Sequence, residues 1–119
     1  MKKIYYLSTC NTCKRIIQEI NLPKSFKKQD IKKESITLED LTRLYGFTGS
    51  YEALFNKRAR MYKEQLMKNN ILQEEDYKKL LLDHYTFLKR PVIINDDEIF
   101  IGNSKKIVEF AKLAINKEP

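Results

Sequence analysis

The stretch that decides the fold is Ile4-Tyr5-Tyr6-Leu7-Ser8-Thr9-Cys10-Asn11-Thr12-Cys13-Lys14-Arg15. Its first four residues are apolar or aromatic, as in a short buried strand, and three isoleucines follow the stretch at helical spacing. Either Asn11 or Thr12 can cap the start of that helix. The pattern therefore predicts a strand that leads through a cysteine-bearing turn into a helix.

The turn carries Cys10 and Cys13, the two cysteines of the chain. We expect Cys10 at the helix N-terminus, where unpaired backbone N–H groups, the helix dipole and the positive charge of Lys14 favour a thiolate. Cys13 falls on the inward face of the helix, so we expect it to be the more buried partner and to resolve rather than attack. The pair indicates a site of thiol chemistry.

Two cysteines can also simply fill space in a core, or they can hold a metal ion. A structural zinc site needs four ligands, and His84 is the only other soft ligand in the sequence. No metal is therefore expected unless two chains share one. The sequence shows no secretory signal, and a close-set pair would staple little of the chain, so we expect a reducing cytoplasm and reversible oxidation.

Length, composition and net charge indicate what class of protein this is and what it can bind. A length of 119 residues and a hydrophobic fraction of 42% predict one globular domain spanning residues 1–119. The longest apolar runs are far shorter than the roughly 20 residues that span a bilayer, so no membrane interaction is expected. The net charge of +7 favours anionic partners such as small oxyanions, nucleic acid or an acidic protein. No groove-reading motif accompanies the scattered lysines, so direct nucleic-acid binding is not expected.

Strand and helix patterns alternate along the chain, which predicts an α/β sheet rather than a helix bundle. Residues 25–31 predict a second strand, parallel to the first. Thr37 and Asp40 have the spacing of a capping box at the start of a helix, and Gly46 is expected to end that helix. Three further helical pieces are expected at residues 51–55, 61–67 and 74–85.

Period-two patterns return near the end of the sequence. Val92–Ile94 and Ile99–Ile101 are apolar runs separated by turn residues, which predicts a hairpin. A final helix follows, with an apolar face expected at Ile107, Phe110, Ala111 and Ala114. The predicted fold is therefore a four-stranded mixed sheet in one domain, with a helical insertion at about residues 37–87 between the second and third strands.

This order of elements, with cysteines after the first strand and Arg90-Pro91 before the third, resembles the thioredoxin superfamily and its thioredoxin-like fold. More narrowly, the chain is similar to the glutaredoxin-dependent arsenate reductases and the related Spx transcriptional regulators. Cys10 matches the catalytic cysteine of that family, and Lys14 matches the basic residue that follows it. Asn56-Lys57-Arg58 resembles an Asn-Thr-Arg motif of the insertion, and Leu88–Ile94 resembles the Arg-Pro entry to the third strand.

The resemblance implies that Cys10 attacks arsenic, that a thiol resolves the adduct, and that glutathione with glutaredoxin, or thioredoxin, restores the enzyme without a bound cofactor. Arg58 and Arg90 would orient the oxyanion, because guanidinium groups bind such anions bidentately. Pro91 is expected to follow a cis bond that faces the cysteines. His84 is expected to be a hydrogen-bonded cap or core residue rather than a catalyst.

Two departures from the arsenate reductase pattern leave the substrate open. Asn103 stands where those enzymes carry another oxyanion-binding arginine, and Tyr6-Leu7 replaces a polar residue ahead of the cysteine loop. Cys13 replaces the serine of the glutathione-dependent type and permits an internal disulfide, as in Spx regulators. The sequence therefore favours a thiol-dependent reductase of an oxyanion or disulfide substrate, with a redox-switched regulator that binds RNA polymerase as the alternative.

Overall fold

The computed structural model describes residues 1–59, 62 and 72–117 of the chain. The chain divides into two compact units, one formed by Met1–Glu34 with Arg90–Pro119 and the other by Ser35–Lys89. The second unit nearly coincides with the expected insertion, and the single-domain organisation stays a prediction. Within the described ranges, every helix is too short or too polar to span a bilayer.

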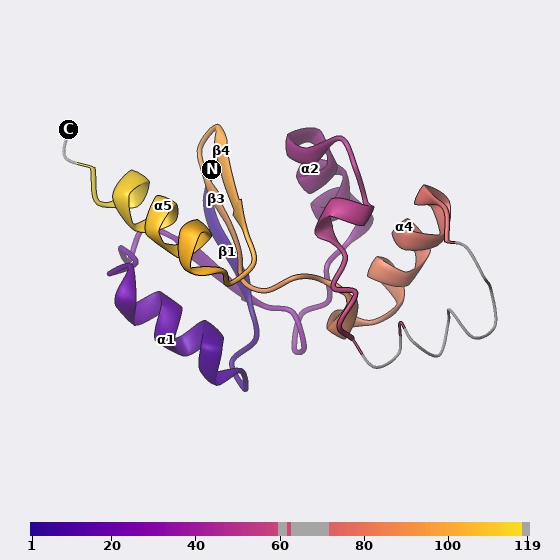
Figure 1. Cartoon of the computed structure of the whole chain (residues 1–119), viewed down its shortest axis with the longest axis horizontal. Coiled ribbons are helices and arrows are strands. Elements are labelled where there is room, and N and C mark those ends of the chain that lie inside the picture. The colour runs from indigo at the N-terminus through magenta and orange to yellow at the C-terminus, as the bar shows by residue number, and fades with distance from the viewer. Residues whose placement is uncertain (60–61, 63–71, 118–119) are drawn as a thin grey trace. The chain divides into compact units, whose positions relative to one another are not determined.

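The first unit contains a mixed four-stranded sheet with the order β2-β1-β3-β4 (Figure 1). The strands are β1 (Lys2–Tyr6), β2 (Lys27–Asp30), β3 (Val92–Asn95) and β4 (Glu98–Ile101). β1 and β2 are parallel, with Ile4 opposite Lys28. The pairs β1–β3 and β3–β4 are antiparallel. The predicted parallel unit, the hairpin and the four-stranded mixed sheet are all confirmed.

Two helices pack against one face of this sheet, α1 (Asn11–Glu19) and α5 (Lys105–Ile115). Side chains alternate between the faces of a strand, so one set of strand residues meets both helices. The shared core consists of Ile4, Ile16, Ile20, Phe26, Ile93, Phe100, Val108 and Ala111. Burial of each large apolar side chain contributes about 1.5–3 kcal/mol, so this core holds the strand, turn and helix of the cysteine segment in place.

Two details of these helices differ from the sequence predictions. Cys10 itself is the N-cap residue of α1, so Asn11 and Thr12 lie inside the helix rather than capping it. In α5, Val108 is buried and Phe110 is 49% exposed. Phe110 lies two residues beyond Val108, roughly 200° around the helix. The expected apolar face was therefore wrong to include Phe110 in place of Val108.

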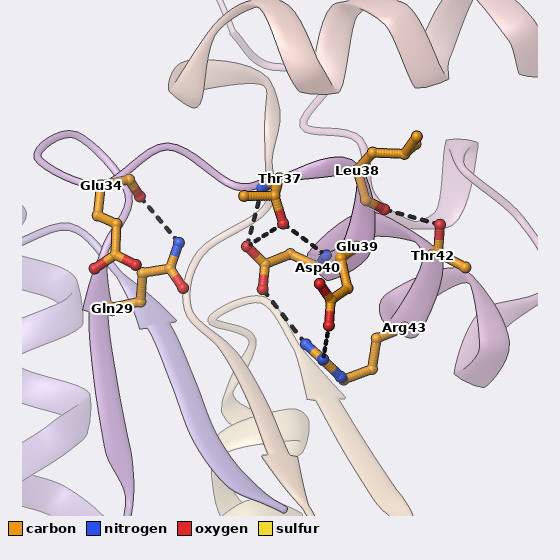
Figure 2. Close-up of polar contacts among 8 residues, drawn as sticks. All are labelled: Gln29, Glu34, Thr37, Leu38, Glu39, Asp40, Thr42 and Arg43. Atoms are coloured by element: carbon orange, nitrogen blue, oxygen red, sulfur yellow. Dashed lines mark hydrogen bonds and ion pairs between the residues drawn. The ribbon is translucent and has the colours of Figure 1, made fainter.

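The second unit begins with α2 (Leu38–Thr48), whose start is fixed by the predicted capping box. The Asp40 N–H donates to Thr37 Oγ1 at 3.0 Å, and the Thr37 N–H donates to Asp40 Oδ2 at 2.9 Å (Figure 2). The expected end at Gly46 is wrong, because α2 continues to Thr48 and ends at Gly49, which has φ of 65°. A left-handed φ favours glycine, whereas glycine inside a helix only weakens the helix.

The remaining described elements of this unit are η1 (Glu52–Leu54), α4 (Glu74–Asp83) and η2 (Tyr85–Phe87). They surround Phe55, whose ring stacks on Phe87 and meets Tyr77 edge-on. The helical piece expected at residues 61–67 lies outside the described residues, apart from Tyr62. His84 lies between α4 and η2, where its Nδ1 accepts a hydrogen bond from the Thr86 N–H at 3.2 Å, as expected for a capping histidine.

Candidate functional site

The cysteine turn connects the end of β1 to the start of α1. The Cys10 N–H donates to the Leu7 carbonyl at 3.0 Å, and the Lys14 N–H donates to the Cys10 carbonyl at 3.2 Å. Cys10 is half-buried and has extended dihedrals, φ of −94° and ψ of 114°, as N-cap residues do. Its predicted position at the helix N-terminus is confirmed, so its sulfur lies beside unpaired N–H groups of the first turn.

The surroundings of Cys10 lower its pKa. Partial burial acts in the opposite direction and raises the pKa, but the N–H and thiol of Cys13, the N–H of Thr12 and the charge of Arg90 together outweigh it. These groups favour the thiolate, which is the nucleophilic form of cysteine.

Cys13 has the opposite character. Its side chain is fully buried, with 0% exposure, and burial raises its pKa to about 11. The negative charge of Cys10 contributes to this raised pKa, against lowering contributions from the Leu7 backbone and from Arg90. Both residues are free thiols. The pair is therefore asymmetric: one accessible sulfur favours the thiolate, and its buried neighbour favours the thiol.

Arg90 lies two residues before β3, and its positive charge lowers the pKa of both Cys10 and Cys13. Its Nε and Nη1 atoms are buried and have no hydrogen-bond acceptor among the described residues. Buried guanidinium donors without acceptors are costly, and they fit an anion that brings its own oxygens. The bond between Arg90 and Pro91 is cis, as the sequence predicted.

Ser8 and Asp30 belong to the same end of the sheet, and the sequence analysis missed them. The Ser8 hydroxyl donates to Asp30 Oδ2, and this contact contributes most to lowering the pKa of the Asp30 carboxyl. The two residues follow β1 and end β2, and the carboxyl ends of neighbouring parallel strands share one edge of a sheet. That rule, applied to Ser8 and Asp30, is the signal that would have found this link to the cysteine turn.

The other two predicted site residues are Lys14 and Arg58. Lys14 is exposed on α1, and its effect on the Cys10 thiolate stays a prediction. Arg58 lies in the Ser35–Lys89 unit, exposed in a turn where its N–H donates to Asn56 Oδ1 at 3.0 Å. Its role toward an oxyanion stays a prediction. Among the described residues, no group of three histidine, cysteine or acidic side chains gathers as a metal site.

The arrangement suits nucleophilic sulfur chemistry on an electron-poor, negatively charged centre. A thiolate at Cys10 can attack such a centre, and the Nε and Nη1 donors of Arg90 can bind oxygens on it. Cys13 lies one helical turn away, where a second sulfur can displace whatever is bound to the first.

Comparison with known proteins agrees with this geometry. A sequence model of the ArsC family matches residues 5–110. The global transcriptional regulator Spx 1 of Bacillus cereus is 22% identical over 115 residues, covering 92% of this chain and 86% of its own.

Two solved structures show the fold. An ArsC family related protein from Bacteroides fragilis superposes with a TM-score of 0.72 at 22% identity, covering 92% of this chain and 97% of its own. The arsenate reductase from Vibrio cholerae superposes with a TM-score of 0.75 at 19% identity, covering 91% and 95%. The predicted thioredoxin-like fold is confirmed.

Proposed function

The chain belongs to the ArsC family, and from that premise we propose that it is a thiol-dependent oxidoreductase in which Cys10 attacks the substrate and Cys13 resolves the adduct. The observation that supports this most is the asymmetry of the pair. Cys10 has a lowered pKa and Cys13 a raised one, and the positive charge of Arg90, whose Nε and Nη1 have no acceptor among the described residues, acts on both. A merely structural pair of thiols has no need of that difference.

The proposed chemistry balances on these two sulfurs. With an arsenate-like oxyanion, the Cys10 thiolate bonds to arsenic and one oxygen leaves as water. Cys13 then attacks the Cys10 sulfur, the sulfur–arsenic bond breaks, and its electron pair stays on arsenic, which is reduced from the pentavalent to the trivalent state. A disulfide substrate follows the same course through a mixed disulfide. Either course ends with a Cys10–Cys13 disulfide.

The timing of the second step follows from the electrostatics. Burial is the main cause of the raised pKa of Cys13, and the negative charge of Cys10 adds to it, so Cys13 is held protonated while Cys10 is a free thiolate. Once the Cys10 sulfur is bonded to substrate, that charge is gone and the pKa of Cys13 falls. The charge of Arg90 then favours the Cys13 thiolate, which is the resolving nucleophile. These pKa differences favour attack by Cys10 first and by Cys13 second.

An external reductant must return the disulfide to two thiols. We assign that role to glutathione with glutaredoxin, or to thioredoxin, as is usual in this family, and we place the cycle in a reducing cytoplasm. The substrate is a small oxyanion or a disulfide. Arg58 is a second proposed oxyanion ligand, and Asn103 supplies no charge where an arginine would strengthen the site.

A coupled assay tests the proposal. Reductant consumption is measured with arsenate and, separately, with bis(2-hydroxyethyl) disulfide, in the presence of glutathione and glutaredoxin or of thioredoxin. We expect turnover of at least one substrate, its loss in Cys10→Ser, and trapping of an adduct in Cys13→Ser. A rate that is the same in wild type and Cys10→Ser would refute it.

A redox-switched regulator is the second candidate, because the chain is similar to the global transcriptional regulator Spx 1 and its own Cys10 and Cys13 are close enough in sequence to form a switchable disulfide. In that case the Cys10–Cys13 disulfide is the signal and RNA polymerase is the partner. Affinity purification of the oxidised and reduced protein distinguishes the two. Recovery of polymerase subunits in one redox state only, together with no turnover of either substrate, would favour the regulator.

A further inference from the structure

A groove runs between α5 and the edge strand β4, and it lies outside the cysteine site. The β4–α5 groove has a volume of about 470 Å³ and is lined by Glu98, Phe100, Phe110, Leu113, Ala114 and Lys117. Two of its apolar side chains are unusually open to water, with Phe110 49% and Leu113 62% exposed. A cluster of large exposed apolar side chains is typical of an interaction surface.

The two edge strands of the sheet, β2 and β4, differ in the charge of their side chains. β2, one edge, exposes Lys27 and Lys28, and lysines on an edge strand discourage pairing with other chains. β4, the other edge, has no lysine and reads Glu-Ile-Phe-Ile. The β4 edge has no lysine and is protected only by its short length and by Glu98, and it is the edge that borders the groove.

The backbone of β4 has hydrogen-bonding groups directed away from the sheet. The Gly102 N–H donates to the Pro91 carbonyl at 2.9 Å, and Phe100 lies opposite Ile93. Alternate residues of an antiparallel strand bond to the same neighbour, so Ile99 and Ile101 direct their N–H and C=O groups to the outer edge. Within the described part of the chain, no strand pairs with that edge.

Charge indicates what the groove attracts. β4, α5 and Lys117 carry four lysines against two glutamates, in a chain whose net charge is +7. Lys106 lies 5.8 Å from the centre of the Phe110 ring, one turn before the exposed apolar side chains, and Lys117 follows Leu113 by one turn. Lys106 and Lys117 outnumber Glu98, the one carboxylate of the lining, so the charge beside the apolar side chains is complementary to an acidic segment with apolar side chains and disfavours a second copy of this cationic chain.

We propose that the β4–α5 groove docks an acidic, extended segment of a partner protein. The segment adds a strand to β4 through Ile99 and Ile101, lays apolar side chains over Phe110 and Leu113, and places carboxylates near Lys106 and Lys117. Strand addition of this kind combines backbone hydrogen bonds with side-chain pockets that give specificity. The docking goes beyond the redox chemistry and does not depend on Cys10.

Fluorescence anisotropy with a labelled eight-residue peptide of alternating glutamate and valine tests the proposal. We expect saturable binding to the wild type, at least tenfold weaker binding to Leu113→Asp, and weaker binding to Lys117→Glu. Leu38→Asp is the matched control, because Leu38 is 54% exposed but belongs to α2. It and Cys10→Ser should bind as the wild type does. In amide exchange, saturating peptide should slow Ile99 and Ile101 and leave Phe100 unchanged.

Three results would overturn the proposal. The first is no saturable binding, or equal binding of a peptide of alternating lysine and valine. The second is equal loss of binding in Leu113→Asp and Leu38→Asp. The third comes from sedimentation: a wild-type dimer that Leu113→Asp dissociates would make a second copy the occupant of the groove.

Discussion

Arg90 lowers the pKa of Cys10 while its own Nε and Nη1 atoms have no acceptor among the described residues. We therefore propose that one half-buried cation does two things: it favours the nucleophilic thiolate and offers donors to an incoming anion. The two roles reinforce each other, because a thiolate and an oxyanion repel unless a cation lies between them. The catalytic proposal depends on this relationship more than on any other contact.

The first prediction concerns the disulfide. Mild oxidation should link Cys10 to Cys13 within one chain, because the residues are three apart across the first turn of α1. Intact mass should fall by two hydrogens and recover with dithiothreitol. When glutathione is present during oxidation, Cys13→Ser should instead retain glutathione on Cys10. A wild type that keeps both thiols under peroxide, or that forms only dimers, would exclude Cys13 as the resolving residue.

The second prediction concerns the anion site. Each charge-assisted hydrogen bond contributes about 1.5–3 kcal/mol, so a missing arginine at Asn103 should weaken arsenate affinity on the order of tenfold to a hundredfold. We expect slow arsenate reduction with a high KM, lower activity in Arg90→Ala, and a lower KM in Asn103→Arg. Arg90→Lys is the control, because it keeps the charge and loses the bidentate geometry.

Steady-state kinetics of these variants separates the possibilities. Efficient wild-type reduction at low arsenate together with an unchanged Arg90→Ala would show that the oxyanion does not bind where we place it. Arg58→Ala then reports on the second proposed ligand, and an unchanged KM would remove Arg58 from the site.

The third prediction concerns pH and the Ser8–Asp30 contact. The folded pKa of Asp30 is lowered, mainly by the Ser8 hydroxyl, so its contribution to stability is present above its unfolded pKa of about 3.9 and is lost as pH falls through the folded value. Ser8→Ala should therefore raise the pKa of Asp30 and reduce the gain in unfolding free energy between about pH 2 and about pH 5.

Urea unfolding across that pH range measures the effect. Ser104→Ala is the matched control, because the Ser104 side chain caps α5 and its loss should cost about 1 kcal/mol at every pH. Parallel pH curves for the wild type and Ser8→Ala would show that the contact does not influence the carboxyl.

The sequence allowed the sheet, the hairpin and the cysteine turn to be predicted, because each has a strong local pattern. Ile99–Ile101 and Val92–Ile94 flank turn residues, and the α1 isoleucines repeat at helical spacing. The errors occur where a sequence pattern fits two different positions. Gly46 and Gly49 both fit a helix end, and only the backbone shows that Gly49 has the positive φ.

The positions of the site cysteines could be predicted from the sequence, but the charged residues that influence them could be predicted less well. Cys10 was expected at the helix start from local pattern alone, whereas the influence of Arg90 on both cysteines depends on the pairing of β3 with β1, whose closest-numbered partners are Tyr5 and Val92. The Ser8–Asp30 contact likewise depends on strand pairing. Charge and spacing along one segment cannot show which distant side chains meet it.

The pH dependence of alkylation tests the central claim most directly. The rate at which iodoacetamide labels each cysteine is measured by peptide mass spectrometry in the wild type, Arg90→Gln and the exposed-cation control Lys14→Gln, each beside the urea-unfolded chain. We predict that folded Cys10 reacts with a midpoint below that of the unfolded chain, that Arg90→Gln raises this midpoint more than Lys14→Gln does, and that Cys13 stays unlabelled until pH approaches about 11. Equal midpoints for the two cysteines, or a Cys10 midpoint that Arg90→Gln leaves unchanged, would contradict the account.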